Sequence, residues 1–184
     1  TDGAVRTYER YVNSGKKEPM NKHTAWSWAW GQGTLSATPI AMARVAAAVV
    51  NDGNMPTTRF LLNQEIESVS IVSPQEAARL NLFMKEEAQA KNFTNSNIGG
   101  KTGTPERYFW DNKGRRHKPN DGWFICFIEN SHIKKNINGT EVTEKAPLAV
   151  AVRLERIGSG MSGKAVSLTK DVVLSTLRNL DYID

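Results

Sequence analysis

The hydrophobic pattern of this chain begins with an almost uniformly apolar run, which predicts a buried helix. The run Ile40–Val50 is nearly all Ala, Val, Ile and Met, with Arg44 as its one charge. A helix that is apolar on almost every side is normally a core helix. Thr38-Pro39 suits its N-cap and first turn, and Asn51-Asp52-Gly53 suits its end. We therefore expect a central core helix within the segment 31–53.

Two further segments carry apolar residues at helical spacing. Ser73-Pro74-Gln75-Glu76 has the form of a capping box with Pro in the first turn, and it predicts a helix over 74–90. After the glycine-rich stretch 158–163, the pattern predicts an amphipathic helix over 164–180. The core positions expected in the first of these helices are Ala77, Leu80, Met84 and Ala88.

Three apolar segments predict strands, over 98–104, 121–129 and 147–155. Asn138-Gly139 is a typical hairpin turn and lies in the polar stretch between the last two. The fold class that this pattern predicts is α+β, an antiparallel sheet with covering helices, the last helix lying on the sheet.

The pattern leaves other regions less determined. Trp26, Trp28 and Trp30 alternate with small residues, which fits either a short strand with one aromatic face or an aromatic loop packed on the core. Two short extended segments are expected at Arg59–Leu62 and Val69–Val72, and the stretch 105–120 is expected to be a long polar connection.

Composition changes this picture little. The chain has 184 residues, 39% of them hydrophobic, and a formal net charge of +5, so one domain with a sizeable core is expected, with a weak preference for acidic partners. Its one cysteine, Cys126, lies in an apolar run and should be a buried, inert thiol. His23, His117 and His132 lack metal-ligand spacing, so we expect no metal and no cofactor.

The strongest chemical signal is Lys101-Thr102-Gly103-Thr104. It places an ammonium, two hydroxyls and a residue without a side chain in succession on a predicted strand. Alternation would point Lys101 and Gly103 to one face and Thr102 and Thr104 to the other, unless the strand twists. Glycine lets a ligand backbone approach closely, so the group suits a carboxylate-bearing ligand lying along a strand edge.

Several motifs, taken in order, make the chain resemble the penicillin-binding protein transpeptidase domain over about residues 25–180. K-T-G is one of the signatures of penicillin-binding proteins and serine β-lactamases. The matching segments are Gly31-Gln32-Gly33 with Thr38–Ala43, Asn51-Asp52-Gly53, Gly100–Thr104, Asp121–Phe124 and Ser162–Val166.

The resemblance implies a fold and a set of site residues. Residues 1–184 would be a partial transpeptidase domain, the C-terminal half of a penicillin-binding or β-lactamase-like fold. Lys101 and Thr104 would be catalytic: Lys101 supplies a fixed positive charge and supports proton transfer, and the Thr104 N–H is an oxyanion donor. Thr102, Gly103 and Thr104 would bind substrate or β-lactam. Gly31, Gln32 and Gly33 would be structural residues near the site.

The resemblance also implies an activity. In this family a serine attacks a D-alanyl-D-alanine stem peptide of peptidoglycan and forms an acyl-enzyme, and β-lactams trap that serine. The parent protein would be bacterial and membrane-anchored, with this domain on the extracytoplasmic (periplasmic) side of the cytoplasmic membrane.

Two family motifs are missing from this chain. The S-x-x-K strings begin at Ser14, Ser131 and Ser167, and none has the family's position or order; no S-x-N string occurs. We therefore expect the missing N-terminal half of the domain, or a partner chain, to supply the serine, and this chain alone to be inactive. The face that the missing part would cover could support self-association.

Alternatives remain. The chain could belong to a β-lactam sensor, a β-lactamase relative or a non-catalytic pseudoenzyme that binds a partner through the stretch 105–120. The segment Tyr108–Lys118 mixes aromatic and basic residues, as nucleic-acid-binding modules do. We favour a solvated loop there and expect no nucleic acid partner.

Overall fold

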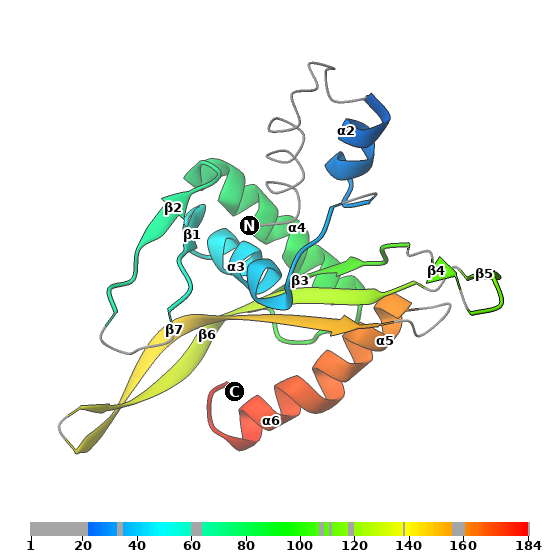
Figure 1. The fold of residues 1–184 in the computed structure, drawn as a ribbon. Coiled ribbons are helices and arrows are strands. Elements are labelled where there is room, and N and C mark those ends of the chain that lie inside the picture. The colour runs from blue at the N-terminus through cyan, green and yellow to red at the C-terminus, as the bar shows by residue number, and fades with distance from the viewer. Residues whose placement is uncertain are drawn as a thin grey trace.

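The fold is built on a three-stranded antiparallel sheet with helices on both faces (Figure 1). The computed structural model describes residues 22–32, 35–59, 64–106, 109–110, 112–117, 120–137, 139–155 and 161–183. The strands are β3 (Ile98–Gly103), β6 (Gly122–Ile137) and β7 (Thr140–Leu154), and their order in the sheet is β3-β6-β7. The predicted α+β class with an antiparallel sheet and covering helices is confirmed.

The register of the sheet divides its side chains between two faces. Directly opposed residues on neighbouring strands share a face. The first row, Lys101, Ile125 and Ala151, lies on one face, and the adjacent row, Thr102, Phe124 and Val152, lies on the other. We call them the α3 face and the α5 face, after the helices that cover them.

The α5 face is covered by the C-terminal helix. This helix consists of α5 (Met161–Leu168), a π-helical stretch η1 (Thr169–Leu174) and α6 (Ser175–Asn179). Its buried side chains pack on the central strand and on Phe93, whose ring stacks on that of Phe124 at 5.3 Å between centroids. Cys126 belongs to this core, and burial raises the pKa of its thiol to about 12, so the thiol stays protonated and inert at neutral pH.

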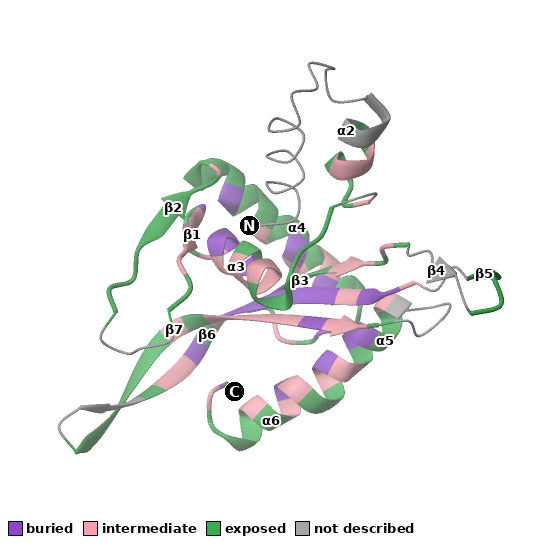
Figure 2. Cartoon of the chain, in the orientation of Figure 1, coloured by how far each residue is buried: buried purple, intermediate pink, exposed green. Residues whose placement is uncertain are grey.

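The α3 face is covered by α3 (Pro39–Val49). Thr38 caps this helix by accepting a hydrogen bond from the Ala41 N–H, as the sequence predicted. Ala46 and Val49 pack against the central strand, but Ile40 on the other side of the helix is 48% exposed. The expectation of a helix buried on nearly every side is therefore wrong here, because within the described residues the sheet covers one side of α3 only (Figure 2).

Helix α4 (Pro74–Ala90) packs along β3, the edge strand. It contributes Met84 to the core on the α3 face and Ala88 to the core on the α5 face. Glu129 on β6 anchors it, because the carboxylate accepts hydrogen bonds from Asn81 at 2.9 Å and from Lys85 at 2.7 Å. Leu80, expected in the core, is instead 41% exposed.

The tryptophan segment is helical. Residues Lys22–Ala29 form α2, so both expectations for it, a strand and a loop packed on the core, are wrong. Trp26 is 75% exposed and Trp30 is 80% exposed. Ser27 and Ala29 between the tryptophans permit a helix, and no neighbouring strand is paired with this segment in the described part of the chain.

A short hairpin follows α3, formed by β1 (Asn54–Pro56) and β2 (Ser68–Ser70). Val69 lies in it as expected, opposite Met55, and Val72 lies just beyond it. Arg59 is not in a strand, and residues 60–62 lie outside the described residues. The connection 105–120 holds a second small hairpin of β4 (Phe109–Trp110) and β5 (Arg116–His117).

Strands β6 and β7 are longer than predicted. They continue through the polar stretch as a two-stranded ribbon that projects past the sheet, with an irregularity between Ile128 and Ser131 (Figure 1). The ribbon closes between Ile137 and Thr140 through Gly139, whose φ of 83° is typical of hairpin turns. Hydrophobicity marks only the buried part of such a strand, because backbone pairing extends further than the core does.

The chain end returns to this ribbon. The His132 N–H on β6 donates to the Tyr182 carbonyl at 2.6 Å, and Ile183 is buried in the core of the α5 face. Lys134 and Asp181 form an ion pair at 3.4 Å in the same place. Residues 181–183 thus bind the edge of β6 just beyond the start of β3.

Gly100→Ala should lower the free energy of unfolding by about 1–3 kcal/mol, because an added methyl group overpacks the core. A Cβ at Gly100 would lie 2.3 Å from the Phe124 ring. Urea unfolding measures the change. Gly163→Ala is the matched control, because nothing lies within 4 Å of a Cβ there. Equal stability of the two variants would contradict the tight packing described for β3.

Ser73→Ala should lower the free energy of unfolding by about 1 kcal/mol through loss of the cap of α4. Hydrogen bonds from Ser73 also lower the pKa of Glu76 below its ordinary value of 4.5. The wild-type carboxylate therefore stabilises the fold above pH 4.5, and this contribution is lost as the pH falls through the lowered pKa. Urea unfolding at pH 7 and pH 3 should show a smaller difference between the two proteins at pH 3.

Candidate functional site

The predicted motif lies at the open end of the edge strand. Lys101, Thr102 and Gly103 end β3, and Thr104 follows it. Lys101 and Thr104 are exposed, while Thr102 and Gly103 are half-buried. A cation and hydroxyls are therefore accessible at a strand edge, which is the arrangement that an extended ligand with a carboxylate requires.

Glu87 on α4 joins the motif. The Thr102 hydroxyl donates a hydrogen bond to Glu87 Oε1 at 3.0 Å, and Lys101 Nζ lies 3.7 Å from the same oxygen. Lys101 Nζ also donates to the Thr102 carbonyl at 3.1 Å. Lys101 and Thr102 belong to opposite faces of the sheet, as alternation predicts, but both reach Glu87 because α4 lies along the edge between the faces. The sequence carried no signal for Glu87.

The glycine–glutamine segment lies against the end of the motif. Gln32 bridges the two: its side-chain amide donates to the Thr104 carbonyl at 3.5 Å, and its Oε1 accepts from the Glu106 N–H at 3.2 Å. Gly31 has a φ of 77°, which favours glycine at this turn after α2. Gly33 lies outside the described residues.

An aromatic and a guanidinium lie beside Gly103 on the α3 face. The register places Gly103, Trp123 and Arg153 in one row across the three strands. Arg153 lies over the Trp123 ring, 5.4 Å from its centroid, and this contact restrains the indole. The sequence predicted the three strands but not this row, although Arg153 is the only charge among the alternating residues of 148–154.

Arg153 is held by two carboxylates. It donates to Asp121 at 2.8 Å and lies 2.8 Å from Glu155. Asp121 is only 2% exposed, and its N–H donates to the Pro105 carbonyl at 3.2 Å. The Asp121–Arg153 ion pair therefore links Pro105, which follows Thr104, to β7 on the far side of the sheet.

The candidate serines lie elsewhere. Ser131 is buried in the ribbon and donates a hydrogen bond to the Ala146 carbonyl; it lies beyond Ile128, which pairs with the start of β3 rather than with Lys101. Ser167 is exposed on α5, and Ser14 lies outside the described residues. None of them is brought to the Lys101–Thr104 motif by a contact that the structure describes.

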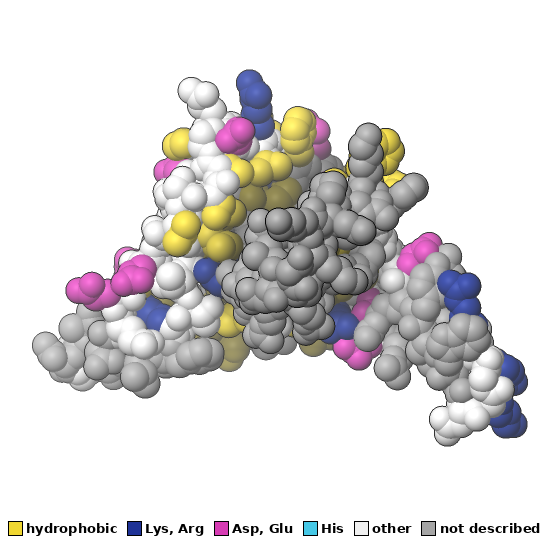
Figure 3. Space-filling model, turned by 45° about the horizontal axis from the view of Figure 1, so that its top comes forward, with side chains coloured by type: hydrophobic (Ala, Val, Ile, Leu, Met, Phe, Trp, Pro, Cys, Tyr) yellow, Lys and Arg dark blue, Asp and Glu magenta, His cyan; other side chains and the backbone are white. Residues whose placement is uncertain are grey.

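Exposed apolar side chains gather on the helical side of the molecule (Figure 3). They come from α2, α3 and α4 and from the segments between them. Phe83 is 64% exposed and Leu82 is 61% exposed, and both lie on α4, away from its buried residues Ala77, Met84 and Ala88. The others include Trp26, Trp30, Leu35, Ile40 and Leu80.

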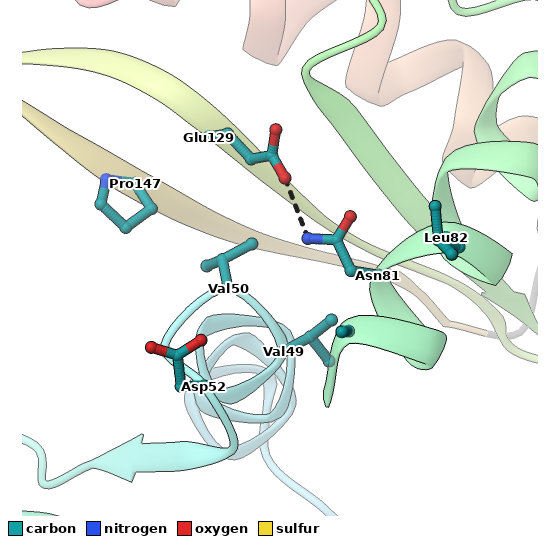
Figure 4. A pocket seen from close by; sticks show the side chains of 8 residues that line it. Val49, Val50, Asp52, Asn81, Leu82, Glu129 and Pro147 are labelled. Atoms are coloured by element: carbon teal, nitrogen blue, oxygen red, sulfur yellow. Dashed lines mark hydrogen bonds between the residues drawn. The ribbon is translucent and has the colours of Figure 1, made fainter. Parts of the chain in front are cut away.

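A pocket of about 550 Å³ lies between the end of α3, helix α4 and the β6–β7 ribbon (Figure 4). Its polar lining is Asp52, Asn81 and Glu129, with the Asn81–Glu129 hydrogen bond crossing it. It is not the Lys101 site, because Glu129 lies beyond the opposite end of β3. Two acidic side chains also make it unsuitable for a carboxylate ligand.

Three further features concern metal ligands, membrane-spanning helices and the segment Tyr108–Lys118. Within the described residues no group of three or more His, Cys, Asp or Glu could hold a metal ion. Among the described helices, none combines the length and apolar character that crossing a membrane requires. Of the mixed aromatic and basic segment, Tyr108 and Lys118 lie outside the described residues, while Lys113, Arg115 and Arg116 are exposed.

Comparisons with known proteins show the family of this chain. The sequence matches the family "Penicillin binding protein transpeptidase domain" over residues 8–146. Among solved structures, PBPA from Mycobacterium tuberculosis is similar in fold, with a TM-score of 0.59 and 22% sequence identity. That match covers 86% of this chain but 36% of the other, so the chain spans about a third of that protein. Among curated proteins none matches.

Asp121→Asn should lower the free energy of unfolding by roughly 1.5–3 kcal/mol, because it weakens a charge-assisted hydrogen bond at a buried carboxylate. Glu155→Gln removes the other carboxylate beside Arg153, but Glu155 is 55% exposed. Its effect should stay below about 1 kcal/mol. Thermal or urea unfolding of both variants measures the difference, and a larger loss in Glu155→Gln would reverse the roles assigned to the two carboxylates.

Proposed function

Because this chain belongs to the family of penicillin-binding protein transpeptidase domains, we propose that it is the C-terminal part of a DD-transpeptidase that cross-links peptidoglycan peptides. The family acts on peptidoglycan peptides and binds β-lactams. The observation that carries the proposal is the Lys101–Thr104 motif at an accessible edge strand, with Gln32 of the glycine–glutamine segment bonded to its end.

In the proposed reaction a serine oxygen attacks the carbonyl of the penultimate D-alanine of a stem peptide. An ester forms, the peptide bond to the terminal D-alanine breaks, and that D-alanine leaves after its amine takes up a proton. An acceptor amine then attacks the ester, the amide cross-link forms, and the serine is released. A β-lactam follows the first step only, because its opened ring stays attached.

Each residue of the motif has a proposed role in this reaction. The Lys101 ammonium attracts the terminal carboxylate of the substrate and supports proton transfer at the serine. The hydroxyls of Thr102 and Thr104 donate hydrogen bonds to that carboxylate. The Thr104 N–H is one donor of the oxyanion hole, and Gly103 leaves room for the substrate backbone.

The proposed serine is supplied from outside this chain, by an N-terminal half of the domain or by a partner chain. Ser131 is buried and bonded in the ribbon, and Ser167 lies on the exposed side of α5. The exposed apolar side chains of α2, α3 and α4 provide the surface on which that missing part would pack. Without it, the same surface favours self-association of this chain.

The family acts outside the cytoplasmic membrane. We propose the same location for this domain, in a bacterial parent protein held by a membrane anchor. A β-lactam sensor, a β-lactamase relative or a pseudoenzyme would share the fold. Deacylation separates a β-lactamase, which turns over, from a transpeptidase, which stays acylated, while a pseudoenzyme never reacts.

The test is intact-mass spectrometry after incubation with benzylpenicillin. We expect a single adduct on a version of the protein extended upstream through S-x-x-K and S-x-N motifs, and none on this chain alone. In the extended protein, Lys101→Ala should slow acylation by about 10²–10⁴-fold, through loss of the group that supports proton transfer. Lys164→Ala, an exposed lysine of α5, should leave the rate unchanged.

Other outcomes would contradict the proposal in different ways. An adduct on this chain alone would show that one of its own serines reacts, and peptide mapping would identify it. No adduct on either protein would favour a non-catalytic relative. Equal rates for Lys101→Ala and Lys164→Ala would remove Lys101 from the mechanism.

A further inference from the structure

A carboxylate is already bound at the Lys101–Thr102 pair. Glu87 Oε1 accepts the hydrogen bond of the Thr102 hydroxyl at 3.0 Å and lies 3.7 Å from the Lys101 ammonium. These are the donor and the cation that the proposed function assigns to the terminal carboxylate of the substrate. Glu87 therefore provides, inside the chain, the same chemical group that the ligand would bring.

The contact is weak enough for a ligand to displace it. The side chain of Lys101 is 59% exposed and that of Glu87 is 28% exposed, so water screens their attraction. Glu87 lies near the end of α4, and its neighbour Glu86 is exposed to solvent. A rotation of the Glu87 side chain would release both Lys101 and Thr102 without moving the helix.

We propose that Glu87 is a specificity-determining residue that competes with the ligand carboxylate for Lys101 and Thr102. This inference rests on the proposed function. A ligand carboxylate gains the one hydroxyl hydrogen of Thr102 only by displacing the glutamate, and the negative charge of Glu87 weakens the attraction of Lys101 for that carboxylate. Both effects lower the net binding free energy of the ligand. A ligand without a carboxylate does not make the exchange and is unaffected by Glu87.

The competing interpretation is that Glu87 only positions the pair. A glutamate that orients Thr102 and Lys101 would assist every ligand, charged or neutral. The two interpretations predict opposite effects of neutralising Glu87. Glu87→Gln distinguishes them, because the amide oxygen can still accept the Thr102 hydrogen bond while the negative charge is removed.

The experiment measures the second-order rate of acylation of the upstream-extended protein by benzylpenicillin and by its uncharged methyl ester. We expect Glu87→Gln to raise the rate with benzylpenicillin by about 2- to 5-fold, the range for the loss of an exposed ion pair, because the hydrogen bond from Thr102 is kept. The rate with the ester should not rise. Glu86→Gln is the matched control, since it removes the same charge one residue away and measures the long-range effect alone.

Each remaining outcome overturns the inference. A fall in both rates would show that Glu87 positions the pair. Equal rates for wild type and Glu87→Gln, or an equal gain in Glu86→Gln, would show that no local competition exists and would leave the proposed function standing. If no protein is acylated, wild type included, the proposed function fails and the inference fails with it.

Discussion

The structure depends on how closely β3 approaches the central strand β6. Phe124 and Phe127 of β6 point to opposite faces of the sheet, and each ring occupies the space that a side chain on β3 would need. Gly99 and Gly100 leave that space empty: a Cβ on either would lie 2.2 or 2.3 Å from the facing ring. Lys101 follows directly, so the two glycines set the position of the candidate site as well as the packing of both cores.

The features that could be predicted from the sequence are those with local causes. The cap at Thr38 and the capping box at Ser73 depend on neighbours three residues away, and both form as expected. The apolar strands were also found, because burial requires their composition. The polar ends of β6 and β7 were not, since a hairpin ribbon is held by backbone hydrogen bonds that leave no mark in hydrophobicity. Trp26, Trp28 and Trp30 alternate with small residues as in a strand, yet Lys22–Ala29 is helical, and in the described part of the chain no strand pairs with it.

The candidate site shows the same division. Lys101–Thr104 is a contiguous motif, so it could be found, and placed on a strand, without the fold. Glu87 and Arg153 come to the site from other elements and could not be found by spacing. Glu87 requires that α4 lie along the strand edge, and the row of Gly103, Trp123 and Arg153 requires the register of the sheet. Both depend on the tertiary structure, and both place a charged side chain, Glu87 or Arg153, near a ligand at the motif.

The contact between Tyr182 and His132 bears on solubility. Past the start of β3, the edge of β6 would offer unpaired N–H and C=O groups, which can recruit a strand from another molecule. Residues 181–183 occupy that edge, with Ile183 buried and Asp181 paired to Lys134. Because residues 181–183 cover this edge of β6 beyond Ile98, where β3 no longer pairs with it, a strand from another molecule has less room to pair there.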